Sequence, residues 1–401
     1  MNSSSLINAK WVVTLITKTL FMPKKQRRDS GKYVQQPTGY KAFIPAGLPL
    51  DPPLDRDNEM WQLLEGATLS LGRLDGTAQI LPDPDLFEYM YVRKEAVLSS
   101  QIEGTQASLE DVLEFEEALA TPDSDIEEVL NHVDAMNYGL RRLDKLPVSL
   151  RLIREIHRKL MAGVRGSEKT PGDFRTSQNW VGGKGSTIRT AAYVPPPPAD
   201  MLAALANLET FIHSESQLPA LIKAGLVHAQ FETIHPFLDG NGRLGRLLIT
   251  FLLCECGVIR RPLLYLSHYF KENQAQYYDL LQATRDFGEW ENWIKFFLRG
   301  VASVGSQAGE TALKITQLME LHRRRVIESR RNSTSAQALL EHLFTRPIVD
   351  VNSVARGTHL SFQNANALVR HFCEIGILEE FTGRERGRRF GYRSYLKLLS
   401  A

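Results

Sequence analysis

The sequence is poor in cysteine and carries no excess of charge of either sign. Its 401 residues include three cysteines, Cys254, Cys256 and Cys373, and no two of them form a Cys-x-x-Cys pair. A disulfide scaffold or a structural zinc site needs more thiols at regular spacing, so neither is expected, and a reduced, cytoplasmic setting fits. Lys and Arg number 48 against 46 Asp and Glu, which gives no global signal for binding a polyanion.

A long hydrophobic run is also missing. The segment 11–22 is fairly apolar, but threonines and a lysine interrupt it. It is too short and too mixed to span a bilayer, and no small-residue cleavage site follows it cleanly. We therefore expect neither a membrane anchor nor a signal peptide. Met22 precedes the basic run Lys24–Arg28 and could equally be the true start, so residues 1–40 are treated as an extension of uncertain order.

The stretch from His235 to Arg246, HPFLDGNGRLGR, brings together many groups that can handle phosphate. A Gly240–Gly242 turn that opens a helix directs backbone N–H groups and the positive end of the helix dipole at one point, which suits phosphate. Arg243 and Arg246 lie three residues apart and share a helix face, so both can reach further phosphate oxygens. Asp239 is placed to hold Mg²⁺, and His235 lies within reach of an attacking hydroxyl. These are the parts needed to transfer a phosphate-linked group.

The same stretch also contains the pattern Gly-x-Gly-x-x-Gly, from Gly240 to Gly245. A dinucleotide-binding site of this pattern needs a strand immediately before it. The apolar residues between Leu221 and Ile234 recur at helical spacing instead, so a helix leads into the turn. We therefore reject a Rossmann interpretation.

The stretch resembles the signature of the Fic (Fido) family, His-x-Phe-x-Asp/Glu-Gly-Asn-Gly-Arg-x-x-Arg, and every fixed position of that pattern is filled. The resemblance implies a mainly helical enzyme that transfers AMP from ATP to a Ser, Thr or Tyr hydroxyl of a protein. It implies His235 as the base and Asp239 as the Mg²⁺ ligand, with ATP as the substrate. The ATP-binding residues implied are Glu103, His235, Gly240, Asn241, Gly242, Arg243, Leu244, Gly245 and Arg246, with the amides of the turn on the α- and β-phosphates and Arg246 on the γ-phosphate.

An acidic motif lies upstream, in the segment from Ser99 to Gly104. Ser99 and Glu103 are four residues apart and share a helix face, and Gly104 is suited to end the helix. A carboxylate at a helix C-terminus opposes the dipole and favours a basic partner, although a solvated glutamate is the alternative. The segment resembles the Fic inhibitory motif, Ser/Thr-x-x-x-Glu-Gly/Asn. By that resemblance Ser99 and Glu103 are inhibitory, and Glu103 pairs with Arg246 and blocks the γ-phosphate.

Residues 174–181 and 187–194 flank a glycine-rich segment and predict a β-hairpin. The hairpin resembles the Fic flap, which pairs with the target chain and positions its hydroxyl. An exposed edge strand can do so by main-chain pairing without demanding a long recognition sequence. The target-docking residues implied are Val181, Gly182, Gly183, Ile188 and Tyr193.

Helical patterns are expected over about 57–75, from 85 to 102, and over 127–143, 149–162, 201–213, 218–233 and 242–255. The region 267–285 carries Asn273, Tyr277 and Tyr278, and Trp290 follows it. One of these residues could border an adenine, and Asn273 and Tyr277 are our candidates for the ATP site. Aromatic residues on helices are more often part of a core, and that alternative stays open.

The last 70 or so residues predict a separate unit, joined by an amphipathic helix over about 309–331. Three short helices are followed by two β-like runs around Phe381 and Phe390, which flank a basic segment. This is the winged-helix pattern, and it resembles the C-terminal domain of some Fic proteins. The third helix would present residue types that read bases and contact phosphates, so DNA is one partner to consider. Docking to a protein or forming a homodimer is the alternative. The outward residues expected are Gln363, Asn364, Asn366, Arg370 and His371.

The expected fold class is mainly α, a Fic/Fido helical core with a short β-hairpin flap plus a C-terminal winged-helix domain. The expected domains are the extension (1–40), an N-terminal helical region with the inhibitory motif (41–120), the catalytic core (121–310), a connecting helix (311–332) and the winged helix (333–401). The expected function is a protein adenylyltransferase that Glu103 inhibits through Arg246. Its expected partners are ATP, a hydroxyl-bearing protein target and the chain itself as a target, with no membrane. The alternatives are a de-AMPylating hydrolase that uses Glu103, a different nucleotide donor, or a transcriptional regulator with a nucleotide-sensing core.

Overall fold

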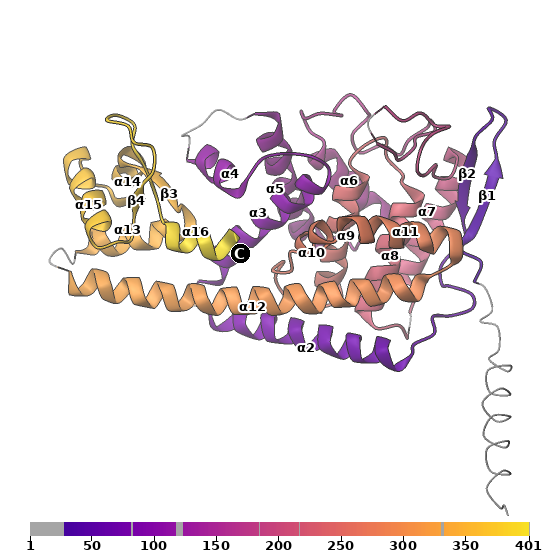
Figure 1. Ribbon diagram of the computed structural model, residues 1–401, viewed down its shortest axis with the longest axis horizontal. Coiled ribbons are helices and arrows are strands. Elements are labelled where there is room, and N and C mark those ends of the chain that lie inside the picture. The colour runs from indigo at the N-terminus through magenta and orange to yellow at the C-terminus, as the bar shows by residue number, and fades with distance from the viewer. Residues whose placement is uncertain are drawn as a thin grey trace, which may run out of the picture.

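Helices form most of the protein, as the computed structural model in Figure 1 shows. The structure describes residues 28–81, 83–117, 123–183, 185–215, 217–329 and 333–400. The apolar segment 11–22 lies outside these residues. The expected mainly helical fold class is confirmed. The elements are β1 (Gly31–Gln35), β2 (Lys41–Pro45), α2 (Asn58–Ile80), α3 (Pro84–Ile102), α4 (Leu109–Glu116), α5 (Ser124–Leu143), α6 (Leu150–Leu160), α7 (Pro198–His213), α8 (Ala220–Ile234), α9 (Asn241–Glu255), α10 (Ser267–Glu272), α11 (Gln274–Phe287), α12 (Trp290–Glu328), α13 (Thr334–Thr345), β3 (Ile348–Asp350), α14 (Val351–Thr358), α15 (Phe362–Glu374), β4 (Glu379–Glu380), β5 (Arg389–Gly391) and α16 (Arg393–Ser400).

The centre of the helical part that precedes α12 is the packed pair α8 and α9. Nearly every residue of these two helices is buried, because other helices cover them on all sides. Their sequences are correspondingly apolar around the whole helix rather than on one stripe, which is the pattern of a core helix. The loop 235–240, which joins the two helices, is therefore held at a fixed position by both of its ends.

Helix α12 runs for 39 residues, and α2 packs along it (Figure 1). The amphipathic helix expected over 309–331 is only the second half of α12. Its first half continues without a break from Trp290 because Trp293, Phe297 and Val301 keep one face buried at helical spacing. The helical part that precedes α12 and the C-terminal unit are thus joined by one continuous helix. In the part of the chain that the structure describes, no helix combines the length and the apolar character that crossing a membrane requires.

The described part of the N-terminal extension, from Arg28 onward, is ordered against the core. Strands β1 and β2 form an antiparallel pair in which Gly31 opposes Pro45, a hairpin that the sequence analysis missed. Arg28 forms an ion pair of 2.8 Å with Glu291 at the start of α12. The N–H of Phe43 in β2 donates to the carbonyl of Val194, so the hairpin also meets the end of the predicted flap.

The predicted flap is less regular than expected. Between 174 and 194, described except for Lys184, the only bridge joins Val181 and Tyr193. Their two backbone hydrogen bonds measure 2.8 and 3.1 Å. The hydroxyl of Thr190 accepts a hydrogen bond from the N–H of Thr187. This contact closes a turn that interrupts the second predicted strand, 187–194. The expected two-stranded hairpin is therefore wrong, and a loop with one bridge replaces it.

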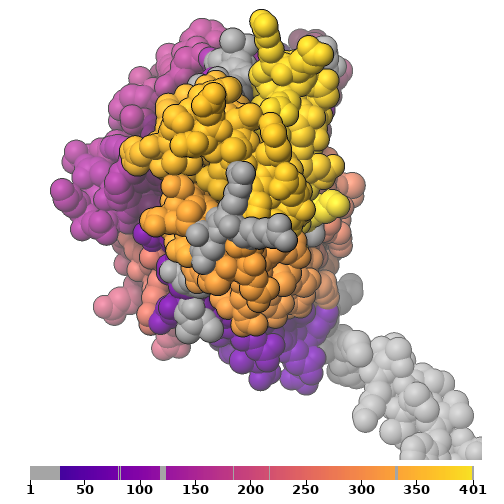
Figure 2. Space-filling model, turned by 90° about the vertical axis from the view of Figure 1, so that its left-hand side faces the viewer, coloured from indigo at the N-terminus to yellow at the C-terminus, as the bar shows by residue number. Residues whose placement is uncertain are grey.

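The C-terminal unit, residues 333–400, has the three helices and the closing strand pair that the sequence predicted. Strand β3 pairs with β5, and β5 pairs with β4, in an antiparallel sheet of order β3-β5-β4. Its assignment as a winged helix stays a prediction. Figure 2, which views the molecule from this end, is filled largely by the unit and the adjoining end of α12.

The third helix of this unit, α15, differs from expectation at one position. Gln363, Asn364 and Arg370 are exposed, and Asn366 accepts a hydrogen bond from Arg388 across 3.1 Å. His371 faces inward instead, with only 8% of its surface exposed, and its Nε2 lies 3.0 Å from the Ser329 hydroxyl. The end of α12 packs against this helix, which explains why His371 is not on the outer face.

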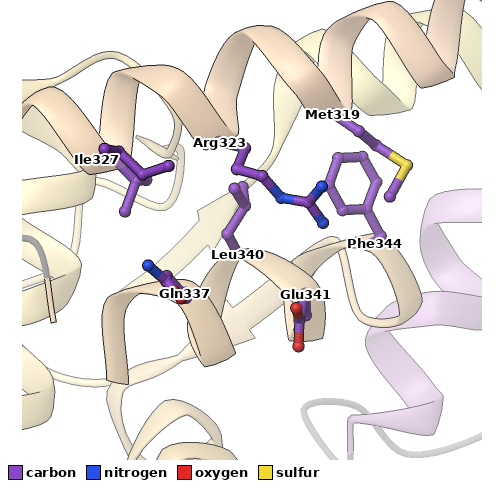
Figure 3. Close-up of a pocket in the computed structure, with 8 residues that line it drawn as sticks. Met319, Arg323, Ile327, Gln337, Leu340, Glu341 and Phe344 are labelled. Atoms are coloured by element: carbon purple, nitrogen blue, oxygen red, sulfur yellow. The ribbon is translucent and has the colours of Figure 1, made fainter. Parts of the chain in front are cut away.

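The contact between α12 and α13 leaves a small cavity of about 110 Å³ (Figure 3). Met319, Arg323 and Ile327 reach it from α12, and Leu340 and Phe344 reach it from α13. Ligand sites usually enclose ~300 Å³ or more, so this gap is a packing defect between the two helices.

Candidate active site

His235 stands at the point where α8 ends. Its backbone adopts a left-handed conformation, with φ of 50°, and its N–H still donates to the carbonyl of Phe231. Arg175 fixes the turn, because its Nε donates to the His235 carbonyl across 3.0 Å. Burial, followed by the charges of Arg285 and Arg175, lowers the pKa of His235 to about 4. The imidazole is therefore neutral at physiological pH, which is the state that a general base requires.

The turn after His235 is held by the side chain of Asn241. The Asn241 Oδ1 accepts from the N–H of Phe237, and its Nδ2 donates to the carbonyl of the same residue, each across 2.8 Å. Asn241 is only 2% exposed, so its amide shapes the loop, and its expected contact with a phosphate stays a prediction. Gly240 has a φ of +74°, and a Cβ there would lie 2.7 Å from the Met161 sulfur, so this position needs glycine.

Arg246 lies under the turn and binds Ser99 and Glu103. Its Nε donates to the Ser99 hydroxyl, and its Nη2 donates to the Ser99 carbonyl, both across 2.9 Å. The same Nη2 donates to Glu103 Oε1 across 2.7 Å. Gly242 faces this pair, and a Cβ on it would come within 2.2 Å of the Glu103 carboxylate. The two sequence motifs, 147 residues apart at Ser99 and Arg246, thus meet in one contact.

Three other residues of the motif do not reach the cavity. Arg243 is buried and points to Glu128, with 3.2 Å between Nη1 and Oε2, because a carboxylate on α5 lies on that side. Leu244 packs into the core with 1% exposure. Gly245 lies against the Glu232 side chain, which leaves no room for a Cβ. None of the three lines the cavity, and their expected places in an ATP site stay predictions.

Asp239 is paired with a residue that the sequence analysis did not single out. Its Oδ2 lies 2.9 Å from the ammonium of Lys169, and its Oδ1 accepts from the N–H of Gly240. Burial opposes ionisation, but Lys169, the N–H of Gly240 and the charge of Arg243 together lower the pKa of Asp239. Among the described residues no cluster of three or more acidic, His or Cys side chains could hold a metal alone. One carboxylate fits Mg²⁺ when substrate phosphates supply further oxygens.

A cavity of about 540 Å³ opens in front of His235 and Arg246, which is within the usual range for ligand sites. The residues that line it come from the end of α3, the loop between 181 and 193, α8, α9 and α11. They are Glu103, Val181, Gly182, Gly183, Ala192, Tyr193, Glu232, His235, Gly242, Arg246, Tyr277, Tyr278, Asp279, Leu281, Gln282 and Arg285.

Only some of the residues considered for an adenine contact lie at the cavity. Tyr277 lines the cavity, and its hydroxyl lies 2.9 Å from Nε2 of the buried His228. Tyr278 is 43% exposed at the cavity wall. Asn273 does not line the cavity, because its amide donates to the Tyr269 carbonyl. Trp290 also lies elsewhere and donates to the Ser30 hydroxyl. Of the flap residues expected to dock a target, only Ile188 is absent from the cavity wall.

Glu232 is a cavity residue that the sequence analysis missed. It lies one helical turn before His235, with 4.0 Å between its Oε2 and the imidazole Nδ1. Burial raises the pKa of its carboxyl to about 7, and its Oε1 has no hydrogen-bond partner among the described residues. The available signal was the single acidic residue of a mostly apolar helix, three residues before a histidine.

Comparison with known proteins matches two regions of the chain to family models. Residues 61–141 match the Fic/DOC family N-terminal region, and residues 147–253 match the Fic/DOC family itself. The chain is 33% identical over 172 residues to a protein adenylyltransferase Fic of Drosophila grimshawi, an alignment that covers 42% of this chain and 32% of the relative. A protein of the same name from Drosophila willistoni is 32% identical over 172 residues, covering 42% and 31%. The chain thus spans about a third of the length of these curated relatives.

The fold itself has a counterpart among solved structures. A Fic family protein from Desulfovibrio desulfuricans superposes with a TM-score of 0.57 at 19% sequence identity. The alignment covers 85% of this chain and 97% of that one. At this identity the similarity establishes the fold alone.

Proposed function

Because the chain belongs to the Fic/DOC family, we propose that it is a protein adenylyltransferase, which transfers AMP from ATP to a Ser, Thr or Tyr hydroxyl of a protein. The observation that carries the proposal is a neutral His235 and a buried Arg246 on the wall of one cavity. Curated relatives that share about a third of this chain's aligned residues carry the name protein adenylyltransferase Fic.

In the proposed reaction His235 takes the proton from the target hydroxyl. The hydroxyl oxygen forms a bond to the α-phosphorus, the bond from that phosphorus to the bridging oxygen breaks, and pyrophosphate leaves with the electron pair. Positioning a base in this way typically contributes ~10²–10⁴ in rate. The N–H groups at the start of α9 and the guanidinium of Arg246 bind the phosphates. Asp239 would hold Mg²⁺, which neutralises phosphate charge when it is bound.

Glu103 is proposed to inhibit this reaction. Its carboxylate binds the guanidinium that a γ-phosphate would need, with 2.7 Å between Oε1 and Nη2. A phosphate in that place would also meet a like charge on Glu103, whose side chain is one-third exposed. Productive binding of ATP therefore requires Glu103 to leave Arg246.

The proposal is tested by incubating the purified chain with ATP and measuring AMP attached to protein by mass spectrometry. We expect Glu103→Gly to raise self-labelling and His235→Ala in the same background to abolish it. The other common nucleotides, supplied in parallel, identify the donor. Unchanged labelling after His235→Ala would refute the proposed chemistry. Unchanged labelling and ATP affinity after Glu103→Gly would refute the inhibition.

Removal of AMP is a second candidate function. Glu103 lines the same cavity as His235, and a carboxylate there could orient a water molecule toward an AMP–protein bond. An AMP-labelled target incubated with the wild-type chain distinguishes the two directions. Loss of the label that requires Glu103 would favour hydrolysis.

Binding of DNA by the C-terminal unit is a separate proposal. Arg384 and Arg386 are exposed in the segment between β4 and β5, and Arg388 of this segment donates to Asn366 of α15 across 3.1 Å. Exposed basic side chains next to a helix are what a groove-binding surface requires. A gel shift on duplex DNA with wild type and with Arg384→Gln/Arg386→Gln tests it. Equal mobility of DNA with and without the chain would leave a transcriptional role without support.

A further inference from the structure

Glu232 of α8 is an acidic side chain that the proposed reaction does not use. It lines the cavity at His235, and only 9% of its side chain is exposed. Its Oε2 lies 4.0 Å from the imidazole Nδ1 of His235. Its Oε1 is buried and has no hydrogen-bond partner among the described residues. A buried polar atom without a partner costs stability, so a carboxylate in this place points to a role in the site.

Helix α9 leaves room for this carboxylate. Gly245 lies against it, and a Cβ at that position would overlap Glu232 Oε1. Glycine inside a helix lowers the stability of the helix relative to alanine. The space that the carboxylate needs accounts for a glycine here. A larger residue at 245 would displace the carboxylate of Glu232.

Charges of both signs face Glu232. Burial raises the pKa of its carboxyl most, and the charge of Glu103 raises it further, while the charges of Arg246 and Arg285 lower it. In the proposed reaction Glu103 has left Arg246, so Glu232 loses a repelling neighbour and ionises more readily. The groups that face it from other elements are Glu103 at the end of α3, Arg246 of α9, and Tyr277, Tyr278 and Arg285 of α11.

His235 needs a negative partner once it has taken a proton. Burial, followed by the charges of Arg285 and Arg175, lowers its pKa to about 4, so the imidazolium ion is disfavoured. The charge of Glu103 opposes this effect. That charge moves away when Glu103 leaves Arg246, whereas Glu232 still lies 4.0 Å from the imidazole.

We propose that Glu232 is a positioning residue for His235, an inference that rests on the function proposed above. Its ionised carboxylate faces Nδ1 and leaves Nε2 to take the proton of the target hydroxyl. The proton stays on the imidazole and the carboxylate stays ionised, so Glu232 stabilises the imidazolium by its charge alone. Because that charge develops only as the proton moves, the contact raises kcat rather than the affinity for ATP.

The rate of AMP labelling in the Glu103→Gly background tests the proposal. Glu232→Gln has nearly the same shape as the wild-type side chain but no charge. Adding it should lower kcat about tenfold and change KM for ATP by less than about twofold, as loss of a contact made in the transition state does. Glu65→Gln, at an exposed position on α2, is the matched control and should leave both constants unchanged.

The pH profile separates the charge of Glu232 from a merely structural role. In the Glu103→Gly parent, kcat should rise with pH as Glu232 ionises, at pH values above the pKa of about 4 at which His235 itself titrates. The rise should be complete by about pH 7, because loss of Glu103 lowers the pKa of Glu232. Glu232→Gln should abolish this rise, and Glu232→Asp, which keeps a carboxylate, should retain it.

The outcomes distinguish this inference from the function on which it rests. No labelling in the Glu103→Gly parent would overturn the reaction proposed at His235, and this inference with it. Labelling in the parent that Glu232→Gln leaves unchanged would overturn this inference alone. A lower kcat in Glu232→Gln with the pH-dependent rise retained would do the same, because packing and not charge would then explain the loss. Thermal denaturation of each variant confirms that it is folded.

Discussion

Lys169 holds Asp239 through an ion pair of 2.9 Å, and the two residues are 70 positions apart in the chain. Both side chains are partly exposed, at 42% and 33%, so the pair can open without unfolding. In the proposed reaction Asp239 binds Mg²⁺, and a hard dication cannot share a carboxylate oxygen with an ammonium group at that distance. Lys169 therefore competes with the metal for Asp239.

The first prediction follows from this competition. In the Glu103→Gly background, Lys169→Gln should reduce the Mg²⁺ concentration needed for half-maximal AMP labelling by about two- to fivefold, the usual strength of a partly exposed pair. The measurement is a magnesium titration of the labelling rate. Lys159→Gln, which removes the more distant partner of Asp134, serves as the matched control. A titration curve for Lys169→Gln that is identical to that of the parent protein would show that Lys169 does not compete with Mg²⁺ for Asp239.

A second prediction concerns two adjacent serines that are both fully buried. The Ser99 hydroxyl accepts from Arg246, whereas the Ser100 hydroxyl has no hydrogen-bond partner among the described residues. Ser99→Ala should lower the free energy of unfolding by about 1–2 kcal/mol, since a bond to a charged donor is lost. Ser100→Ala should change it by less than ~0.5 kcal/mol. Chemical denaturation of both variants measures the difference, and equal values would contradict the assigned contact.

The third prediction concerns pH and Glu232. Burial raises the pKa of this carboxyl from 4.5 to about 7 in the folded protein. Below the lower value both the folded and the unfolded chain are protonated, and the group has no effect on stability. As the pH rises, the unfolded chain ionises first, so the folded protein loses up to about 3 kcal/mol by pH 7 and no more above it.

Glu232→Gln removes this titration. The variant should gain stability relative to wild type between pH 4.5 and 7, and the difference should level off at higher pH. Denaturation curves at several pH values measure it, with the exposed Glu168→Gln as the control. A difference between Glu232→Gln and wild type that does not vary with pH would mean that the carboxyl titrates normally.

The fourth prediction concerns the contact between α4 and the C-terminal unit. Glu114 forms an ion pair with Arg389, and Glu110 forms one of 2.9 Å with Arg393. Replacing both glutamates by glutamine should raise amide hydrogen exchange in 333–400 several-fold, because each pair contributes ~0.2–1 kcal/mol to the closed contact. Glu127→Gln, a change at an exposed position on the neighbouring α5, should leave hydrogen exchange in 333–400 unchanged. High salt should reproduce the effect in wild type.

The sequence predicted the helices well because their signal is local. Apolar spacing and capping residues such as Asp57, Asp83 and Ser149 act within one or two turns, and each of these side chains accepts from the backbone as such a cap does. The pairing of Glu103 with Arg246 was expected only through the resemblance to a known family. The structure brings these two residues together, while their proposed roles await experiment.

What the sequence did not reveal depends on partners far along the chain. Nothing near Asp239 indicates Lys169, and nothing near Arg243 indicates that Glu128 draws it away from the cavity. The Asn241 amide was assigned to a phosphate through the resemblance to a known family, and its two polar atoms also form hydrogen bonds within its own loop. The sequence analysis predicted two full strands in the flap because residues 187–194 have a β-like composition. That composition does not reveal the turn that Thr190 closes.

The unbroken helix α12 sets the distance between its two ends. At ~1.5 Å per residue, its 39 residues extend about 58 Å, nearly twice the diameter of a small domain. One end packs near the ring of Tyr277 beside the cavity of His235, and the other end carries the C-terminal unit. A small protein bound at one end cannot reach the other. The helix thus ties the part of the chain around His235 to the C-terminal unit along a single rigid rod.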